Sequence, residues 1–280
     1  MAYKTILVCL NEISRLNQLI GAAAALGGTY DAHVSGLYVI PSVQVYPSVG
    51  FEAAPQVFEG NRTFFKENLA KTKDAFETAM RKEGLSFDFR NVDSSTPIIA
   101  DEVIAQGRAA DLILLSQTDA GEMSGVERDF VEQVVMAAGR PVLVLPFKGE
   151  PKIDFSEVIL GWDGGREAAC ATFDALPILK SAKRVRVLRI DPQKDPSLRG
   201  KVAGADIAET LARHSVKAET MAYPTEGLGE GQALLRCAGD NGADLIVMGA
   251  YGHSRLTEFI FGGATRHILA NLDRPILMSH

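Results

Sequence analysis

Short apolar runs alternate with segments of helical periodicity along the whole chain. The runs at Leu112–Ser116 and Leu245–Met248 are almost entirely apolar, as expected of strands buried on both faces of a parallel sheet. Between such runs, apolar residues recur at near-helical spacing, most clearly from Phe65 to Met80, which indicates amphipathic helices. This alternation of strand and helix patterns predicts an α/β fold with helices on both faces of the sheet.

The expected elements follow the same order in each half of the chain. In the first half, strands are predicted at Thr5–Leu10, Ala32–Val39, Ser86–Val92, Leu112–Ser116 and Pro141–Leu145, with helices at Leu16–Leu26, Phe65 to about Glu83, Ile98–Gln106 and Val131–Ala138. In the second half, strands are predicted at Val158–Trp162, Val185–Ile190, Lys217–Ala222, Leu245–Met248 and Pro275–Met278, with helices at Glu167–Leu179, Gly204–His214, Gln232–Asp240 and Thr265–Ala270. The stretch Pro41–Asn61 carries scattered prolines and glycines and is predicted to be irregular.

The two halves are also similar residue by residue. The matching pairs of segments are Lys4–Asn11 with Ser156–Asp163, Leu37–Val39 with Leu188–Ile190, Ala110–Leu115 with Ala243–Met248, and Arg140–Val144 with Arg274–Met278. Matches that recur in one order indicate two copies of a single domain. We expect the copies at residues 1–148 and 152–280, with Pro146–Pro151 as the linker.

A glycine-rich segment follows the strand at Leu245–Met248. Gly249 comes directly after the strand, Gly252 lies three positions later, and Gly262 and Gly263 precede the next predicted helix. A strand, a glycine turn and a helix start together can present free N–H groups to an anion, and glycine lets a phosphate approach the backbone. We therefore expect a phosphate site here. A helix-capping loop that binds nothing is the alternative.

The spacing Gly-x2-Gly-x9-Gly, with its lead-in Ala243–Gly249 and the closing strand Arg274–Met278, resembles the nucleotide-binding signature of the universal stress protein family. The resemblance extends over nearly the whole chain. It implies two tandem Rossmann-like domains, each a five-stranded, mainly parallel sheet flanked by helices. Fifth strands pair across the dimer of single-domain members, so Pro141–Leu145 and Pro275–Met278 are expected to pair here as an intrachain pseudo-dimer. Gly263 replaces the family's Ser or Thr after the third glycine, which removes a hydroxyl.

The resemblance implies that the second copy binds ATP or a related adenine nucleotide, as a signalling or protective module of the stress response. Asp163 ends the first strand of this copy, where its carboxylate can accept a hydrogen bond from a ribose hydroxyl or the adenine amine, or cap the next helix. Ile190 matches the family position whose backbone meets adenine. His253 and Arg255 could reach the triphosphate or be solvated loop residues.

The full candidate set for nucleotide binding is Asp163, Gly164, Ile190, Gly249, Gly252, His253, Arg255, Gly262, Gly263, Ala264 and Thr265. A triphosphate would bring Mg²⁺, held mainly by phosphate oxygens and water, and we expect no dedicated metal site in the protein.

The first copy lacks the corresponding residues. Asn11 stands at the position of Asp163, and the segment after Leu112–Ser116 lacks both motif glycines. Asp119 and Glu122 instead place negative charge where phosphates would lie. We therefore expect the first copy to be a structural partner that binds no nucleotide.

Composition restricts the class of protein. A formal charge of −6 and a pI near 5.5 argue against a nucleic-acid-binding surface. The N-terminus has no apolar signal region, and no apolar run approaches the ~18 residues of a membrane span, so a cytoplasmic protein is expected. Cys9, Cys170 and Cys237 are widely spaced and are predicted to be reduced core cysteines.

No catalytic motif accompanies the glycine segment. The chain has no Walker-type loop, no nucleophile elbow and no His or Cys spacing typical of a metal site. Catalytic residues are therefore not assigned, and any ATP hydrolysis is expected to be slow. Gly227–Gly231 is predicted to be a flexible loop at the same sheet edge.

Two other functions stay open at this level. One is a ligand-free adaptor or chaperone-like interaction protein, which the replacement at Gly263 favours. The other is an enzyme acting on adenylates, such as an α-phosphate hydrolase or an adenylyl transferase. The identity of the nucleotide, of protein partners and of any further homo-oligomer is also left open.

Overall fold

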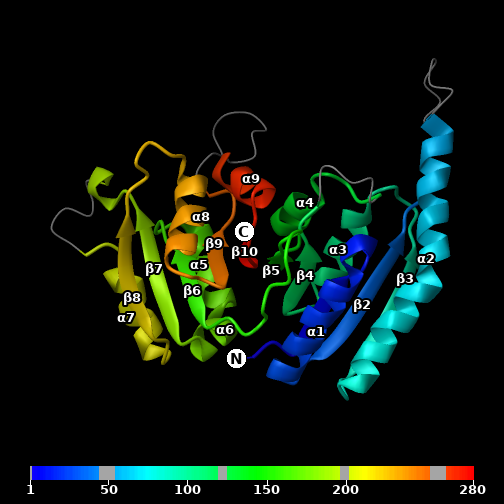
Figure 1. The fold of residues 1–280 in the computed structure, drawn as a ribbon, viewed down its shortest axis with the longest axis horizontal. Helices are drawn as coiled ribbons and strands as arrows, with labels where there is room; N and C mark the ends of the chain where they lie inside the picture. The colour runs from blue at the N-terminus through cyan, green and yellow to red at the C-terminus, as the bar shows by residue number, and fades with distance from the viewer. Residues whose placement is uncertain (1, 44–53, 119–124, 196–201, 253–262) are drawn as a thin grey trace. The chain divides into compact units, whose positions relative to one another are not determined.

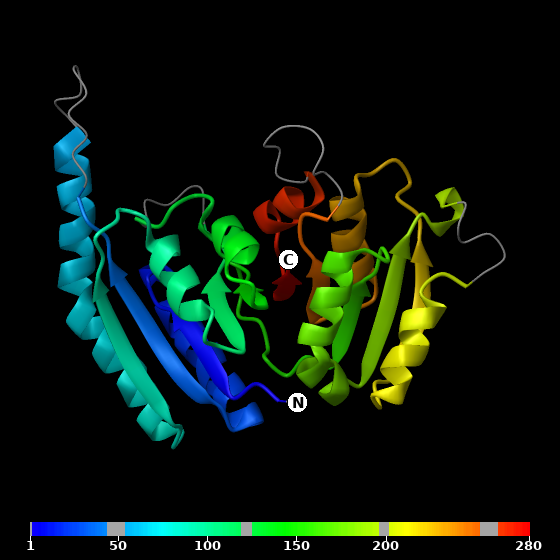
Figure 2. The same cartoon turned by 180° about the vertical axis from the view of Figure 1, so that it is seen from behind.

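The computed structural model describes residues 2–43, 54–118, 125–195, 202–252 and 263–280. The chain divides into two compact units, Ala2–Arg140 and Pro141–His280 (Figure 1). In each unit, helices cover both faces of a mainly parallel sheet, as Figure 2 shows from the opposite side. The predicted α/β class is confirmed. Among the helices of the described residues, none has the length and hydrophobicity that crossing a membrane requires.

The unit Ala2–Arg140 is built on four parallel strands in the order β3-β2-β1-β4. Its strands are β1 (Thr5–Cys9), β2 (His33–Ile40), β3 (Phe87–Asp93) and β4 (Leu112–Ser116). Its helices are η1 (Ile13–Arg15), α1 (Leu16–Tyr30), α2 (Ala54–Lys82), α3 (Ile99–Gly107) and α4 (Phe130–Ala137).

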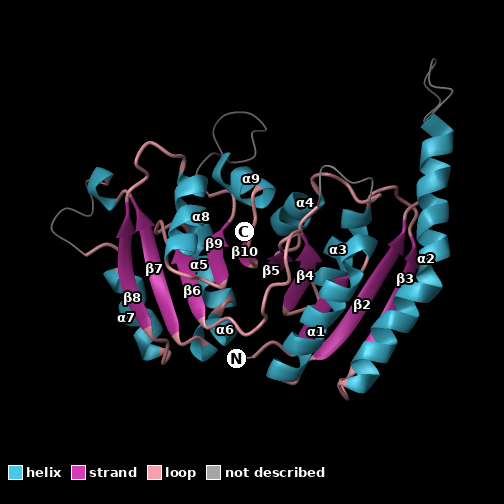
Figure 3. Ribbon diagram, viewed as in Figure 1, coloured by secondary structure: helices cyan, strands magenta, loops and turns pink. Residues whose placement is uncertain are grey.

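Among the described residues, the unit Pro141–His280 has the strand order β5-β10-β9-β6-β7-β8 (Figure 3). The pair β5 and β10 is antiparallel, and the other described pairs are parallel. The strands of this unit are β5 (Val142–Leu145), β6 (Glu157–Gly161), β7 (Arg184–Ile190), β8 (Ala218–Tyr223), β9 (Leu245–Gly249) and β10 (Ile276–Ser279). Its helices are α5 (Arg166–Asp174), α6 (Leu176–Ser181), η2 (Pro192–Lys194), α7 (Ala205–Arg213), α8 (Glu230–Asp240) and α9 (Gly263–Ala270).

Strand β5 pairs with β10, as the sequence predicted for the two fifth strands. Leu143 lies opposite Leu277 in this antiparallel ladder, and both side chains are fully buried. The pairing explains why β5 falls within the compact unit Pro141–His280. The domain boundaries expected from the sequence repeat, 1–148 and 152–280, place β5 in the first copy. These boundaries describe the repeat and stay a prediction.

Two of the predicted helices differ most from the structure. Helix α2 begins at Ala54, so the later part of the expected irregular stretch is helical, while residues 44–53 lie outside the described residues. The predicted helix Glu167–Leu179 is two helices, α5 and α6. Pro177 lies in the first turn of α6, where proline is tolerated because its missing N–H would have no partner in the helix.

The amphipathic face predicted for α2 packs onto the sheet. Phe65 and Phe76 are fully buried, and Phe65 meets the ring of Tyr38 edge-on at 5.9 Å between centroids. A Cβ at Gly36 of β2 would lie 2.8 Å from the Phe76 ring. Glycine in this strand therefore makes room for the helix.

Candidate functional site

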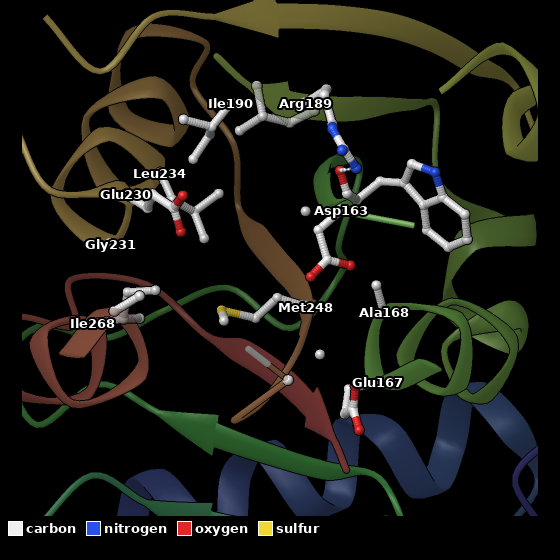
Figure 4. Close-up of a pocket in the computed structure, with 16 residues that line it drawn as sticks. Asp163, Glu167, Ala168, Arg189, Ile190, Glu230, Gly231, Leu234, Met248 and Ile268 are labelled. Atoms are coloured by element: carbon white, nitrogen blue, oxygen red, sulfur yellow. Dashed lines mark hydrogen bonds between the residues drawn. The ribbon is translucent and has the colours of Figure 1, made fainter. Parts of the chain in front are cut away.

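A cavity of about 220 Å³ opens at the carboxyl ends of β6, β7 and β9 (Figure 4). The chain runs outward through β6, β7 and β8 and then returns to β9 on the other side of β6. The strand order therefore reverses between β6 and β9, which is where open α/β sheets bind ligands. The lining residues are Gly161, Trp162, Asp163, Glu167, Ala168, Leu188, Arg189, Ile190, Glu230, Gly231, Leu234, Met248, Gly249, Gly252, Ala264 and Ile268.

One wall of the cavity combines apolar side chains with a polar backbone edge at Ile190. The N–H of Asp191 donates to Tyr223 O in β8, and the N–H of Trp162 donates to Leu188 O in β7. Backbone groups of successive residues in a strand point to opposite neighbours, so Ile190 presents its N–H and C=O toward the β6 side. Strand β6 ends at Gly161, and the Ile190 edge lines the cavity beyond that end.

Asp163 follows β6 and takes part in the local structure of the turn. Its Oδ1 accepts a hydrogen bond from the N–H of Gly165 at 2.7 Å, immediately before α5. This bond lies in the turn before the helix, and the N-cap Gly165 receives no side-chain cap, so the helix-capping role that the sequence offered as an alternative is not what the structure shows. Asp163 also lines the cavity. Gly164 has a φ of +81°, a left-handed conformation that glycine adopts without strain.

Glu167 lies in the first turn of α5, and sequence reasoning did not assign it to the site. Its side chain lines the cavity although the residue is only 9% exposed. Within the part of the chain that the structure describes, its carboxylate has no hydrogen bond or ion pair. A Cβ on Gly252 would lie 3.0 Å from Glu167 Oε2 and 3.9 Å from Asp163 Oδ2. The two carboxylates therefore converge on Gly252.

The charged groups that line the cavity are predominantly acidic. Glu230 opens α8 and adds a third carboxylate. Arg189 is the one basic residue in the described lining, and its Nη2 lies 2.7 Å from Asp195 Oδ2. Because this guanidinium is already ion-paired, the described lining offers little positive charge to an anion.

The glycines of the motif have different structural roles. A Cβ on Gly249 would lie 2.4 Å from the backbone N of Ala168 and from the backbone C of Glu167. Gly249 is therefore required by the close approach of β9 to α5. A Cβ on Gly263 would meet no atom within 4 Å among the described residues, so their packing does not demand a glycine there.

Part of the backbone between Gly249 and Gly252 is already hydrogen-bonded. The N–H of Ala250 donates to Ser279 O at 2.9 Å, and the N–H of Tyr251 donates to Thr265 Oγ1 at 3.5 Å. Two of the N–H groups that were expected to be free for a ligand are therefore used within the protein. The expectation is left with the N–H of Gly252, at the end of this run. The Thr265 hydroxyl, expected to contact phosphates, is buried and faces Tyr251.

The structure brings part of the predicted set together. The cavity is lined by five of the predicted residues: Asp163, Ile190, Gly249, Gly252 and Ala264. Three others are sequence neighbours of lining residues but do not line the cavity: Gly164, Gly263 and Thr265. His253, Arg255 and Gly262 lie outside the described residues.

Lining residues that sequence reasoning missed come mainly from helices α5, α8 and α9. Gly231 was expected in a flexible loop, but it lies in α8, where a Cβ would be 2.7 Å from Ala264 O. It therefore permits α8 to pack closely on α9. An acidic residue in the first helical turn after Asp163 was the available signal for Glu167.

The equivalent backbone edge in the unit Ala2–Arg140 is occupied by the protein itself. Asn11 is fully buried; its Nδ2 donates to Val39 O at 2.7 Å, and its Oδ1 accepts from Val39 N–H at 3.0 Å. Val39 corresponds to Ile190 in the internal repeat, as Asn11 corresponds to Asp163. The carboxamide thus satisfies the N–H and the C=O of Val39, which correspond to those that Ile190 presents to the cavity.

This chain is similar in sequence and in fold to universal stress proteins. Residues 179–280 match the universal stress protein family. Universal stress protein Slr1230 from Synechocystis sp. is 23% identical over 98% of this chain and 99% of its own. The crystal structure of a universal stress protein from Archaeoglobus fulgidus superposes with a TM-score of 0.65 at 15% identity, over 98% of this chain and 97% of that chain. Another Archaeoglobus fulgidus universal stress protein, solved in complex with dAMP, matches 51% of this chain and 98% of its own, with 18% identity and a TM-score of 0.33.

Proposed function

We propose, from the premise that the second half of this chain carries a universal stress protein domain, that its cavity binds ATP or a related adenine nucleotide. The observation that carries the proposal is the exposed backbone edge of Ile190 beside an apolar wall. Adenine is a flat apolar ring whose edge carries an amino donor next to a ring-nitrogen acceptor. That pair complements one C=O and one N–H of a single residue.

The first unit supplies an internal precedent for this recognition. There the Asn11 carboxamide, which also presents a donor beside an acceptor, makes both hydrogen bonds to Val39. In the second unit the base would take the place of that carboxamide at Ile190. Leu188, Leu234 and Met248 would contact the ring, because apolar side chains form most of a ligand pocket.

The rest of the nucleotide would extend toward the glycine segment. Asp163 lies at the cavity rim and would accept a hydrogen bond from a ribose hydroxyl. The phosphates would lie near Gly252 and the start of α9, where backbone N–H groups and the helix dipole favour an anion. We propose occupancy of this site, rather than rapid turnover, as the basis of a nucleotide-dependent signalling or protective role.

Calorimetry with the full-length protein at low micromolar concentration tests the proposal. Adenosine, AMP, ADP and ATP are compared with GTP in the presence of Mg²⁺. Guanine reverses the donor and acceptor at the corresponding edge, so its binding should be at least tenfold weaker. Saturating ATP should also raise Tm, since a ligand at a hundred times its Kd stabilises by about 2.7 kcal/mol.

Two results would contradict the proposed adenine site. The first is the absence of both binding heat and a change in Tm at millimolar ATP, which would favour the adaptor-like alternative. The second is equal affinity for ATP and GTP, which would remove the role given to Ile190. Pyrophosphate released during long incubation with ATP would instead support an adenylate-processing enzyme.

A further inference from the structure

Glu167 is a buried acidic side chain that the proposed adenine site does not by itself explain. It is 9% exposed, lines the cavity, and has no hydrogen bond or ion pair within the described ranges of the chain. Burying a carboxylate without a partner is costly unless a cation or a donor completes it. Glu167 therefore presents an acceptor without a partner to the cavity, among the residues described.

The carboxylate is directed at the place where the phosphates would lie. Glu167 Oε2 would be 3.0 Å from a Cβ on Gly252, and Asp163 Oδ2 would be 3.9 Å from the same point. Figure 4 labels both acidic side chains in the cavity lining, Asp163 from the loop after β6 and Glu167 from α5.

The N-terminus of α5 cannot neutralise a phosphate in addition to these acids. The N–H of Gly165 already donates to Asp163 Oδ1 at 2.7 Å, and Glu167 lies in the first turn of the same helix. The positive end of the helix dipole thus stabilises two carboxylates that are already present. Arg189 is held by Asp195 at 2.7 Å, so it offers no uncommitted charge to offset them.

A phosphate chain at Gly252 would consequently meet two negative charges at short range, and like charges repel strongly in a partly desolvated site. A divalent cation removes this conflict. Mg²⁺ is commonly held by one or two carboxylates together with substrate phosphates. Two carboxylates are too few to hold it alone, and no group of three or more His, Cys, Asp or Glu side chains converges as a metal site among the residues described.

We propose that Glu167 is a ligand for a divalent cation that arrives with the nucleotide, and that it makes binding of the phosphate chain conditional on that cation. This inference rests on the proposed adenine-nucleotide function. It assigns to Glu167 a preference for metal-bound over metal-free phosphates. The glycine motif alone would not confer this preference, because backbone N–H groups can bind both forms.

Calorimetry on the full-length protein with four ligand conditions tests the inference. ATP and adenosine are each titrated with Mg²⁺ and with EDTA. Wild-type protein should bind ATP at least tenfold more weakly in EDTA, whereas its affinity for adenosine should be the same in both buffers. Mg²⁺ alone should give no saturable heat at the concentrations used with ATP.

The variant E167Q keeps the shape of the side chain and removes its charge. We expect it to bind metal-free ATP more tightly than wild type does, with the effect of Mg²⁺ reduced to less than about threefold. Asp206 occupies the first turn of α7 and is exposed, so D206N makes the same change of charge at a matched helix position outside the cavity. It should retain the full dependence on Mg²⁺.

A spectroscopic readout reports the metal directly. With Mn²⁺ in place of Mg²⁺, the relaxation rate of water protons in the ternary complex should differ between wild type and E167Q, because one ligand of the ion has been lost. If E167Q folds poorly, its Tm will show this. The wild-type titrations in Mg²⁺ and EDTA can still contradict the inference in that case.

The possible outcomes separate this inference from the proposed function. Equal ATP affinity in Mg²⁺ and EDTA, or an unchanged Mg²⁺ effect in E167Q, would overturn the role of Glu167 and leave nucleotide binding intact. Binding of adenosine without any binding of ATP would also overturn it. The absence of binding in all four conditions would refute the adenine-nucleotide site itself, and this inference with it.

Discussion

At the scale of single residues, one functional group differs between the two halves at the matching backbone edge. Asn11 and Asp163 occupy the same place in the repeat. The amide of Asn11 both donates to and accepts from Val39, whereas a carboxylate can only accept and therefore cannot satisfy a backbone C=O. Asp163 instead accepts from Gly165. The chemistry of this side chain decides whether the backbone edge is closed or presented to a cavity.

This contrast predicts an unusual order of affinities for variants of Asp163. D163N introduces an amide that can bridge Ile190 as Asn11 bridges Val39, so it should bind ATP more weakly than D163A, which cannot. Loss of the carboxylate alone should cost about 1.5–3 kcal/mol, the range for a charge-assisted hydrogen bond. Calorimetry on both variants measures the order. If D163N binds better than D163A, the bridging argument is wrong.

Glu127 gives a pH-dependent prediction in the other unit. Burial is the largest cause that raises the pKa of its carboxyl above the ordinary value, although the N–H of Ile99 donates to it. Glu127 Oε2 is buried without a partner among the described residues. A raised pKa in the folded state means that the stabilising effect of the proton is present at low pH and is lost as the pH rises.

The variant E127Q should therefore stabilise the protein at neutral pH. It keeps an acceptor for the N–H of Ile99 and removes the buried charge. We expect Tm to rise by about 2–4 °C at pH 7, equivalent to ~1 kcal/mol in a domain of 150–250 residues, and the difference to vanish near pH 4. Thermal unfolding at both values checks this. An equal gain at both pH values would mean that titration of Glu127 is not the cause.

At the scale of elements, close contacts between backbones determine how the cavity is framed. Gly249 lets the end of β9 meet the start of α5, and Gly231 lets α8 approach α9 at Ala264. Helices set further apart would widen the cavity and separate its apolar wall from Gly252. The glycines of this region therefore act partly through packing, in addition to any contact with a ligand.

A pair of glycine substitutions tests this distinction. G249A would place a Cβ 2.4 Å from backbone atoms of Glu167 and Ala168, which cannot move independently of α5. Overpacking of this kind costs about 1–3 kcal/mol, so Tm and nucleotide affinity should both fall. G263A meets no atom within 4 Å among the described residues and should leave Tm almost unchanged. Equal Tm values for the two variants would contradict the packing role of Gly249.

At the scale of the whole molecule, the two copies of one sequence pattern differ at the edge where the cavity lies. The unit Pro141–His280 contains the cavity, whereas the unit Ala2–Arg140 closes the matching backbone edge with its own side chain. Strand β5 joins the sheet of the second unit through β10. The tandem chain thus encodes within one polypeptide the strand pairing that its sequence predicted.

This asymmetry predicts that each chain binds one nucleotide. Equilibrium dialysis of the intact protein with labelled ATP should saturate at one equivalent per chain, because Asn11 occupies the edge in the first unit. D163N should lower the affinity of that single site and should create no second site. Saturation at two equivalents would refute the structural role assigned to the first copy.

Much of the fold was predictable from local patterns. A strand buried on both faces is largely apolar, and the run Leu112–Ser116 forms a strand with the predicted bounds. Proline residues predicted the start of a helix less reliably than apolar runs predicted strands. Pro55 was taken as a sign of irregular structure, yet it lies in the first turn of α2, where proline is compatible with a helix.

The sequence by itself determined the alternation of strands and helices, the internal repeat and the glycine spacing after β9, because each is a pattern between residues close in the chain or between two similar segments. Only the tertiary structure decided that Gly249 is required by the backbone of α5, that Asn11 fills the edge at Val39, and that Glu167 faces Gly252. These facts depend on distances between segments far apart in sequence, and such distances are set by how the elements pack together.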